Sequence, residues 1–115
     1  MAQAGIIATG DVSPANPATW TTSTDAYIGE TGAGSVTVDD DSDLFSRDGY
    51  MGDQSGSTGA VTVSGAGSTW TNSYYLYVGS HGDGTLDITN GGAVSSTYGR
   101  IGDQSGSTGA ATVSG

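Results

Sequence analysis

The side chains with the most evident metal-binding chemistry lie in an acidic run in the first half of the chain. Asp39, Asp41 and Asp43 have the alternate spacing that opens an EF-hand calcium loop. The loop pattern then fails, because Leu44 stands where that loop needs glycine and Tyr50 where it needs a bidentate glutamate. We therefore expect a solvated acidic turn, with calcium at Asp39, Asp41 and Asp43 as the alternative and no other cofactor.

A second set of side chains suits binding through aromatic rings. These candidate binding residues are Tyr27, Tyr50, Tyr77, Tyr75, Tyr98 and Arg100. They fall in two columns two residues apart, so extended chains would point both columns the same way, with Arg100 stacked on Tyr77. Such a wall could bind sugar rings or form a protein contact. The alternative is that stacked tyrosines only stabilise neighbouring strands.

The residues suited to catalysis are few. His81 is the only histidine, and its counterpart in the other half of the chain is Thr31, so we expect an exposed loop variant rather than a base. Arg47 and Arg100 are the only basic residues and do not share a repeat position. No combination of nucleophile, histidine and acid is discernible, and glycines are not gathered into a phosphate-binding loop. We expect no enzyme activity.

The charge of the chain narrows the choice of partner. The 115 residues carry a formal net charge of −10 with only 2 basic side chains. Binding to nucleic acid needs clusters of Lys and Arg along the phosphate backbone, so we expect no nucleic acid partner. No apolar run approaches the roughly 18 residues that span a bilayer, so we expect no membrane insertion.

A repeat must position all of these side chains. The segment Pro17 to Gly65 recurs as Gly67 to Gly115 at an offset of 50 residues, and the sequence GDQSGSTGA occurs unchanged in both copies. A period of this length indicates stacked supersecondary units. We divide the chain into an N-terminal lead-in or cap (1–16), a first repeat (17–66) and a second repeat (67–115). Each repeat holds two turns, of which the last is incomplete.

Three columns of apolar residues within the repeat predict strands. The columns are Val36, Val61, Leu86 and Ala111; Ile28, Met51, Val78 and Ile101; and Trp20, Leu44, Trp70 and Val94. The first column alternates with polar residues and follows glycines at 34, 59, 84 and 109, where we expect positive φ at a turn. The pattern predicts an all-β fold: a parallel β-helix (β-solenoid) with three short strands per turn of roughly 25 residues and about four to five turns. An antiparallel sandwich is the alternative.

The most specific motifs of the chain are GSTW, LYVG, GTL-x-I and NGG, all within Gly59 to Ser96. With these motifs the sequence from about Thr19 to Gly115 resembles the type V secretion (autotransporter) and PEP-CTERM-associated repeat of bacterial surface proteins. The resemblance implies an exported, extended right-handed β-solenoid, usually within a longer array, without catalytic residues. The chain departs from the pattern at Asp39 to Asp43, where the second copy reads TNGGA, so we expect a locally different corner there.

We therefore expect a structural or adhesive module, secreted or on the bacterial cell surface, that acts as a stalk or scaffold. Its expected partners are neighbouring repeats of a longer chain or further copies of itself. The alternative function is a carbohydrate-binding module that uses the tyrosines. Ala2-Gln3-Ala4 has the small-x-small form of a signal-peptidase site, with an ordinary flexible terminus as the alternative. The last turn stops partway round, which we interpret as a piece of a longer protein.

Overall fold

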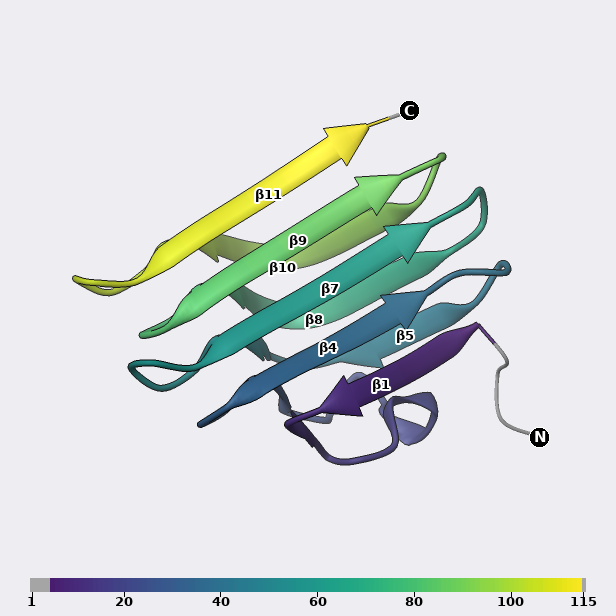
Figure 1. Ribbon diagram of the computed structural model, residues 1–115. Helices are drawn as coiled ribbons and strands as arrows, with labels where there is room; N and C mark the ends of the chain where they lie inside the picture. Colours follow the sequence, from purple (N-terminus) through teal and green to yellow (C-terminus); the bar gives the residue numbers. More distant parts are fainter. Residues whose placement is uncertain (1–4, 115) are drawn as a thin grey trace.

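Two β-sheets face each other across a thin core in the computed structural model, which describes residues 5–114 (Figure 1). In each coil the chain runs along one sheet, turns, returns along the other, and then stacks the next coil on the last. The strands β4, β7, β9 and β11 rise one above another in the same direction, and the chain passes behind them at their C-terminal ends (Figure 1). The coil is therefore right-handed, and the predicted β-solenoid is confirmed, with about four turns.

The front sheet of Figure 1 has the strand order β1-β4-β7-β9-β11 and the back sheet the order β10-β8-β6-β3-β2, with β5 also paired to β8. The front strands are β1 (Ile6–Gly10), β4 (Ala33–Val38), β7 (Thr58–Ser64), β9 (Asp83–Thr89) and β11 (Thr108–Ser114). The back strands are β2 (Val12–Ser13), β3 (Ala26–Ile28), β5 (Asp43–Ser46), β6 (Gly49–Met51), β8 (Thr69–Val78) and β10 (Ala93–Ile101). A 3-10 helix, η1 (Pro17–Thr19), lies between β2 and β3.

The parallel register places equivalent residues of successive coils on one another. Val36 pairs with Val61, and Val61 in turn pairs with Leu86. The other two apolar columns lie in the back sheet except for Trp20, which follows η1 outside any strand. They form separate strands β5 and β6 in one coil but the single continuous strands β8 and β10 in the next two, so the predicted three short strands per turn occur, among the coils described, only in the coil of β4, β5 and β6. Thr71 to Val78 contains β-branched and aromatic residues and no glycine, which favours one long strand over two short ones.

The core between the sheets is built from the predicted columns. Val38, Val63, Ile28, Met51 and Leu44 are fully buried, and the indole of Trp70 is the largest buried side chain. Because each coil contributes apolar residues at the same few positions, a chain with few hydrophobic residues still forms one continuous core.

The positive backbone φ angles occur at a different set of glycines from the one predicted. Among the glycines with positive φ, four follow the residues of the Ile28 column: Gly29, Gly52, Gly79 and Gly102, with φ of 75°, 67°, 82° and 68°. Gly34, Gly59, Gly84 and Gly109 do not have positive φ. They are needed for a different reason, because a Cβ at Gly59 would collide with the carbonyl oxygen of Ile28, and the others meet backbone in the same way.

The acidic corner does not have the locally different backbone that its sequence predicted. Asp40 and Asp41 have φ of 53° and 62°, and the equivalent Asn90 and Gly91 have φ of 52° and 86°. Both corners thus turn through two successive left-handed residues. Aspartate tolerates this conformation better than most residues because its short polar side chain bonds locally.

The first strands cover one end of the solenoid. β1 pairs antiparallel with β4 over five residues, and β2 pairs antiparallel with β3. The small-x-small sequence Ala2-Gln3-Ala4 lies outside the described residues. No helix in the described part of the chain has the length and apolar character needed to cross a bilayer.

The glycines at equivalent positions 49 and 99 provide a matched test of the coil stacking. A Cβ at Gly49 would lie 2.7 Å from Cζ2 of Trp70 and 2.8 Å from Oδ1 of Asn72, whereas at Gly99 the nearest atom, Oγ of Ser96, is 3.6 Å away. We expect Gly49→Ala to lower the free energy of unfolding by about 1–3 kcal/mol through overpacking. Gly99→Ala should stay within about 0.5 kcal/mol of wild type. Denaturant unfolding measures both, and equal losses would contradict the stacking described.

Candidate functional site

Three tyrosines of successive coils form a ladder on the outer surface of the back sheet. Tyr27, Tyr50 and Tyr77 are paired in register through β3, β6 and β8. Their ring centroids are 4.9 and 5.0 Å apart and their planes differ by 9° and 7°. Parallel strands lie about 4.8 Å apart, so this register forces the rings into face-to-face contact. Alternation directs the rings away from the core while their neighbours Ile28 and Met51 point inward.

The second predicted tyrosine column continues the same stack. The ring of Tyr75 lies 5.3 Å from Tyr77, with the planes 18° apart, and 4.9 Å from Tyr98, with the planes 29° apart. The structure thus brings all five predicted tyrosines into one contiguous surface, which we call the tyrosine wall: Tyr27, Tyr50, Tyr77, Tyr75 and Tyr98.

A sixth tyrosine, Tyr74, belongs to this surface and was not among the predicted residues. Its ring makes edge contacts with Tyr75 at 4.6 Å and with Tyr98 at 5.4 Å. Strict alternation would have turned Tyr74 inward, but the register between β8 and β10 shifts between Ser96 and Tyr98, so two residues of β8 oppose Thr97 alone. The signal was present in the sequence: Trp70 and Val78 are one residue further apart than Leu44 and Met51.

Both arginines of the chain lie over rings of this surface. The guanidinium carbon of Arg47 is 5.4 Å from the centroid of Tyr74, and that of Arg100 is 5.8 Å from the centroid of Tyr75. Arg100 was predicted to stack on Tyr77, its partner in the register. Tyr77 is already covered by the rings of Tyr50 and Tyr75, so the guanidinium contacts the outer ring instead. An ion pair of 3.2 Å with Asp103 holds it there.

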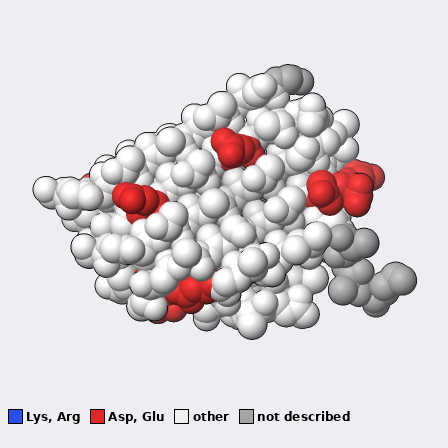
Figure 2. Space-filling model, in the orientation of Figure 1, with Lys and Arg blue, Asp and Glu red and all other residues white. Residues whose placement is uncertain are grey.

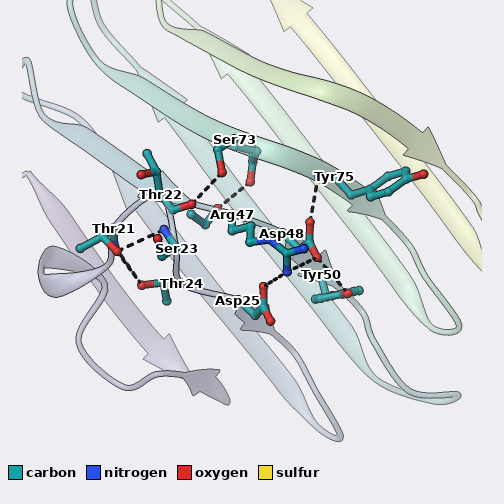
Figure 3. Close-up of polar contacts among 12 residues, drawn as sticks. Thr21, Thr22, Ser23, Thr24, Asp25, Arg47, Asp48, Tyr50, Ser73 and Tyr75 are labelled. Carbon is teal, nitrogen blue, oxygen red and sulfur yellow. Dashed lines mark hydrogen bonds and ion pairs between the residues drawn. The ribbon is translucent and has the colours of Figure 1, made fainter.

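Asp48 is a buried carboxylate inside the tyrosine wall (Figure 3). Its Oδ1 accepts a hydrogen bond from the backbone N–H of Tyr75 at 3.0 Å, and its Oδ2 accepts one from the hydroxyl of Tyr50 at 3.4 Å. Nη1 of Arg47 lies 3.6 Å from Asp48 and 3.4 Å from Asp25. Asp48 therefore links two tyrosines of the wall, Tyr50 and Tyr75, from neighbouring coils, and unlike Asp25 it is withdrawn from solvent.

The coil that carries Asp48 is short at this point, which lets its two neighbours meet across it. The hydroxyl of Ser73 donates a hydrogen bond of 2.7 Å to the carbonyl oxygen of Thr22, two coils away (Figure 3). The hydroxyl of Thr97 in turn bonds the carbonyl oxygen of Ser73 at 2.9 Å. The bulge of β8 is thus fixed from both sides, and the position of Tyr74 is fixed with it.

The stacking changes the acidity of the phenols. Burial raises the pKa of Tyr50 to about 12, with the negative charge of Asp48 as the next cause. Burial also raises the pKa of Tyr27, with Asp53 as the next cause, and the pKa of Tyr77, with Tyr75 as the next. The hydroxyl groups of Tyr27, Tyr50 and Tyr77 therefore stay neutral, and able to donate hydrogen bonds, to higher pH than an ordinary phenol.

The ring faces of the wall are covered rather than free. Tyr50 has a tyrosine on each face, and Tyr75 has the rings of Tyr77 and Tyr98 against it. No pocket opens among residues 5–114. Sugar binding by aromatic residues uses exposed ring faces, and within this surface Tyr98 at 50% exposure and Tyr74 at 39% offer the most area for a ligand.

The acidic corner is held by contacts with the next coil. Oδ1 of Asp43 accepts a hydrogen bond of 2.7 Å from the hydroxyl of Thr69, and the backbone N–H of Asp41 donates one of 3.2 Å to Oγ of Ser68. Across the part of the chain that the structure describes, no three His, Cys, Asp or Glu side chains are grouped so that they could hold a metal ion. The ring nitrogen Nδ1 of His81 lies 3.1 Å from the carbonyl oxygen of Asp53.

The buried position of Asp48 generates a prediction with a matched control one coil away. We expect Asp48→Ala to lower the free energy of unfolding by about 1–3 kcal/mol, because it leaves the N–H of Tyr75 without its acceptor. Asp25→Ala, at the equivalent position of the preceding coil, removes only an exposed ion pair and should cost less than about 1 kcal/mol. Urea denaturation compares the two variants. A cost for Asp25→Ala as large as that for Asp48→Ala would refute the role given to Asp48.

The raised pKa of Tyr50 generates a prediction for alkaline pH. The folded state holds this proton more tightly than the unfolded state, whose tyrosine has a pKa of 10.0. Its contribution to stability is therefore complete below pH 10 and is lost as the pH rises through about 12. Tyrosinate absorbance during a pH titration should contain a late fraction, and Tyr50→Phe should remove its latest part, which titrates near 12, while the raised pKa values of Tyr27 and Tyr77 leave the rest. Ionisation of all tyrosines together near pH 10 would contradict the stacked arrangement.

Comparison of the chain with protein-family models, with curated proteins and with solved structures found no match.

Proposed function

We propose that this chain is a structural or adhesive β-solenoid module that acts as a stalk or scaffold of an exported bacterial surface protein. The observation that carries the structural role is the position of Tyr50, which is sandwiched between Tyr27 and Tyr77 with both ring faces covered. Rings in this arrangement bind successive coils to one another. The proposed site of action, secreted or on the cell surface, derives from the sequence resemblance.

The mechanism of such a module is mechanical. Continuous ladders of backbone hydrogen bonds run through both sheets, and the tyrosine wall adds a second, side-chain ladder along the same axis. Each aromatic pair contributes about 0.5–1.5 kcal/mol beyond the area it buries. Bending the stack would separate both ladders at once, so the coil resists bending. The net charge of −10 favours solubility of the folded rod.

Carbohydrate binding is the second candidate function, and one observation favours it. Tyr98 and Tyr74 are half exposed at the outer end of the wall, with Arg47 and Arg100 beside them. An exposed ring flanked by hydrogen-bond donors is the usual surface for a sugar ring. This patch is small, and it does not include the central tyrosines on which a longer glycan-binding face would depend.

Substitutions at the centre and at the end of the wall distinguish the two functions. We expect Tyr50→Ser to lower the free energy of unfolding by about 1–3 kcal/mol, because it removes two stacked pairs. Tyr98→Ser also removes two ring contacts, but its ring is 50% exposed and buries less apolar area, so the loss should be smaller than for Tyr50→Ser. Thermal unfolding measures these losses, and retention on polysaccharide affinity gels is measured in parallel. Retention of the wild type that Tyr98→Ser abolishes without loss of stability would favour the carbohydrate-binding alternative.

A further inference from the structure

The tyrosine wall holds the readily oxidised side chains that solvent reaches. The chain has no cysteine, and among residues 5–114 the thioether of Met51 and the indoles of Trp20 and Trp70 are buried, at 0%, 4% and 0% exposure. The tyrosines of the wall are all at least partly exposed. Cysteine, methionine and tryptophan are the usual competitors for an oxidant, so an oxidant in solution meets the phenols first.

The opposite face of the solenoid offers no comparable group in the part of the chain that the structure describes. The side chains that β7 turns outward there are Ala60, Thr62 and Ser64. Acidic side chains are scattered over the same face (Figure 2). None of these side chains gives up an electron to an oxidant that oxidises a phenol, so one-electron oxidation is directed to the back sheet.

Tyr27, Tyr50 and Tyr77 are arranged for coupling between rings. Two phenoxyl radicals join through a face-to-face complex, in which the carbons beside one phenolic carbon lie over those of the other ring. The planes of the pairs Tyr27–Tyr50 and Tyr50–Tyr77 are only 9° and 7° apart. Those of Tyr74 and Tyr75 are 70° apart, so that pair lacks the required overlap. The stacked rings are held together by the folded coils, which raises the effective concentration of each ring for its neighbour.

Asp48 provides a proton acceptor at the centre of this ladder (Figure 3). A phenol that loses an electron becomes strongly acidic, so its hydroxyl proton must be taken up as the electron leaves. Oδ2 of Asp48 lies 3.4 Å from the hydroxyl oxygen of Tyr50 and accepts its hydrogen bond. Asp25, at the equivalent position of the preceding coil, accepts a hydrogen bond from Arg47 instead. Transfer of the proton to a positioned carboxylate therefore favours oxidation at Tyr50.

We propose that the tyrosine wall is a site of oxidative cross-linking, at which hydrogen peroxide and an enzyme of the peroxidase class join Tyr50 to Tyr27 or to Tyr77 as dityrosine. Each of the two phenols gives up one electron and one proton, and the proton of Tyr50 passes to Asp48. One bond then forms between a Cε atom of each ring, and the hydrogen on each of these carbons moves to the phenolic oxygen, which restores both phenols. Hydrogen peroxide takes up the two electrons and two protons and leaves as two molecules of water.

The inference rests on the exported scaffold role proposed above and deepens it, because an exported protein meets oxidants outside the cell. The new bond fastens successive coils covalently in a chain that has no cysteine for a disulfide. Like a disulfide, it restricts the unfolded chain. The linked protein should therefore unfold at a higher temperature than the untreated protein, and an unchanged unfolding temperature would contradict a bracing role for the link.

Digestion with trypsin identifies the link, because trypsin cleaves after basic residues and the two arginines are the only ones in the chain. The digest yields fragments 1–47, 48–100 and 101–115, and Tyr27 is the only tyrosine of the first. A link between Tyr27 and Tyr50 joins the first two fragments, which no disulfide can do in this chain. A link between two tyrosines of 48–100 instead lowers the mass of that fragment by two hydrogen atoms.

The test treats the dilute, folded protein with hydrogen peroxide and a haem peroxidase, and it follows dityrosine fluorescence and the mass of the tryptic fragments. We expect the joined fragment, at a yield per chain that does not change on dilution. Tyr50→Phe keeps the ring stack without the phenol and should lower the yield of the joined fragment at least about tenfold. Tyr98→Phe, at the outer end of the wall, should leave that yield unchanged. Asp48→Asn should slow the reaction several-fold, and the matched variant Asp25→Asn should not.

Three results would overturn the proposal: the absence of both links to Tyr50, a joined fragment that Tyr50→Phe leaves unchanged, or a yield that falls with dilution, which marks coupling between separate molecules. Equal rates for Asp48→Asn and Asp25→Asn would overturn the role given to Asp48. The stability loss expected for Tyr50→Ser needs no oxidant. Failure of the cross-linking is thereby distinguishable from failure of the scaffold role.

Discussion

The in-register stacking of parallel strands is the constraint on which the rest of this structure depends. Residues one coil apart are held at the strand spacing of about 4.8 Å, so each side chain meets its own equivalent above and below. For valine in the front sheet this produces a dry core, and for tyrosine in the back sheet it produces stacked rings. In-register stacking thus creates both the hydrophobic core and the tyrosine wall, which we propose stabilises the contact between successive coils.

The same rule imposes a cost wherever successive coils differ in length or in side-chain volume. Gly49 is glycine because Trp70 and Leu76 of the next coil occupy the space that a Cβ would need. The indole nitrogen of Trp70 donates to the hydroxyl of Ser46, which in turn donates to Oδ1 of Asn72. These buried polar groups are satisfied within the coil pair, and they fix which large residue lies over which small one. An extra residue in β8 is accommodated as a bulge, and the hydroxyls of Ser73 and Thr97 anchor it to the coils on either side.

Sequence periodicity predicts the columns because a solenoid converts a spacing along the chain directly into a position in space. The three apolar columns, the parallel register and the five tyrosines of the wall follow from counting residues. Features that depend on departures from the period were not predicted from the sequence. Tyr74 faces outward only because of a bulge, and Arg100 contacts Tyr75 because the neighbouring rings already cover Tyr77. The prediction of positive φ for the glycines at 34, 59, 84 and 109 was wrong, because these positions need glycine for the close approach of another backbone segment. Both requirements select glycine, so the sequence alone does not distinguish them.

Stacking satisfies each coil through its neighbours, so whatever remains unsatisfied accumulates at the last coil. Tyr98, Ile101 and Val113 are exposed for this one reason, although one belongs to the wall, one to the core under the back sheet and one to the core under the front sheet. The patch that could accept a sugar ring consists of Tyr98 and Tyr74 at the exposed end of the wall. Tyr50 and Tyr77 have a neighbouring ring on each side, so their faces already contact protein and hold successive coils together. Glycan binding and stabilisation of the stack therefore depend on different tyrosines of the same wall.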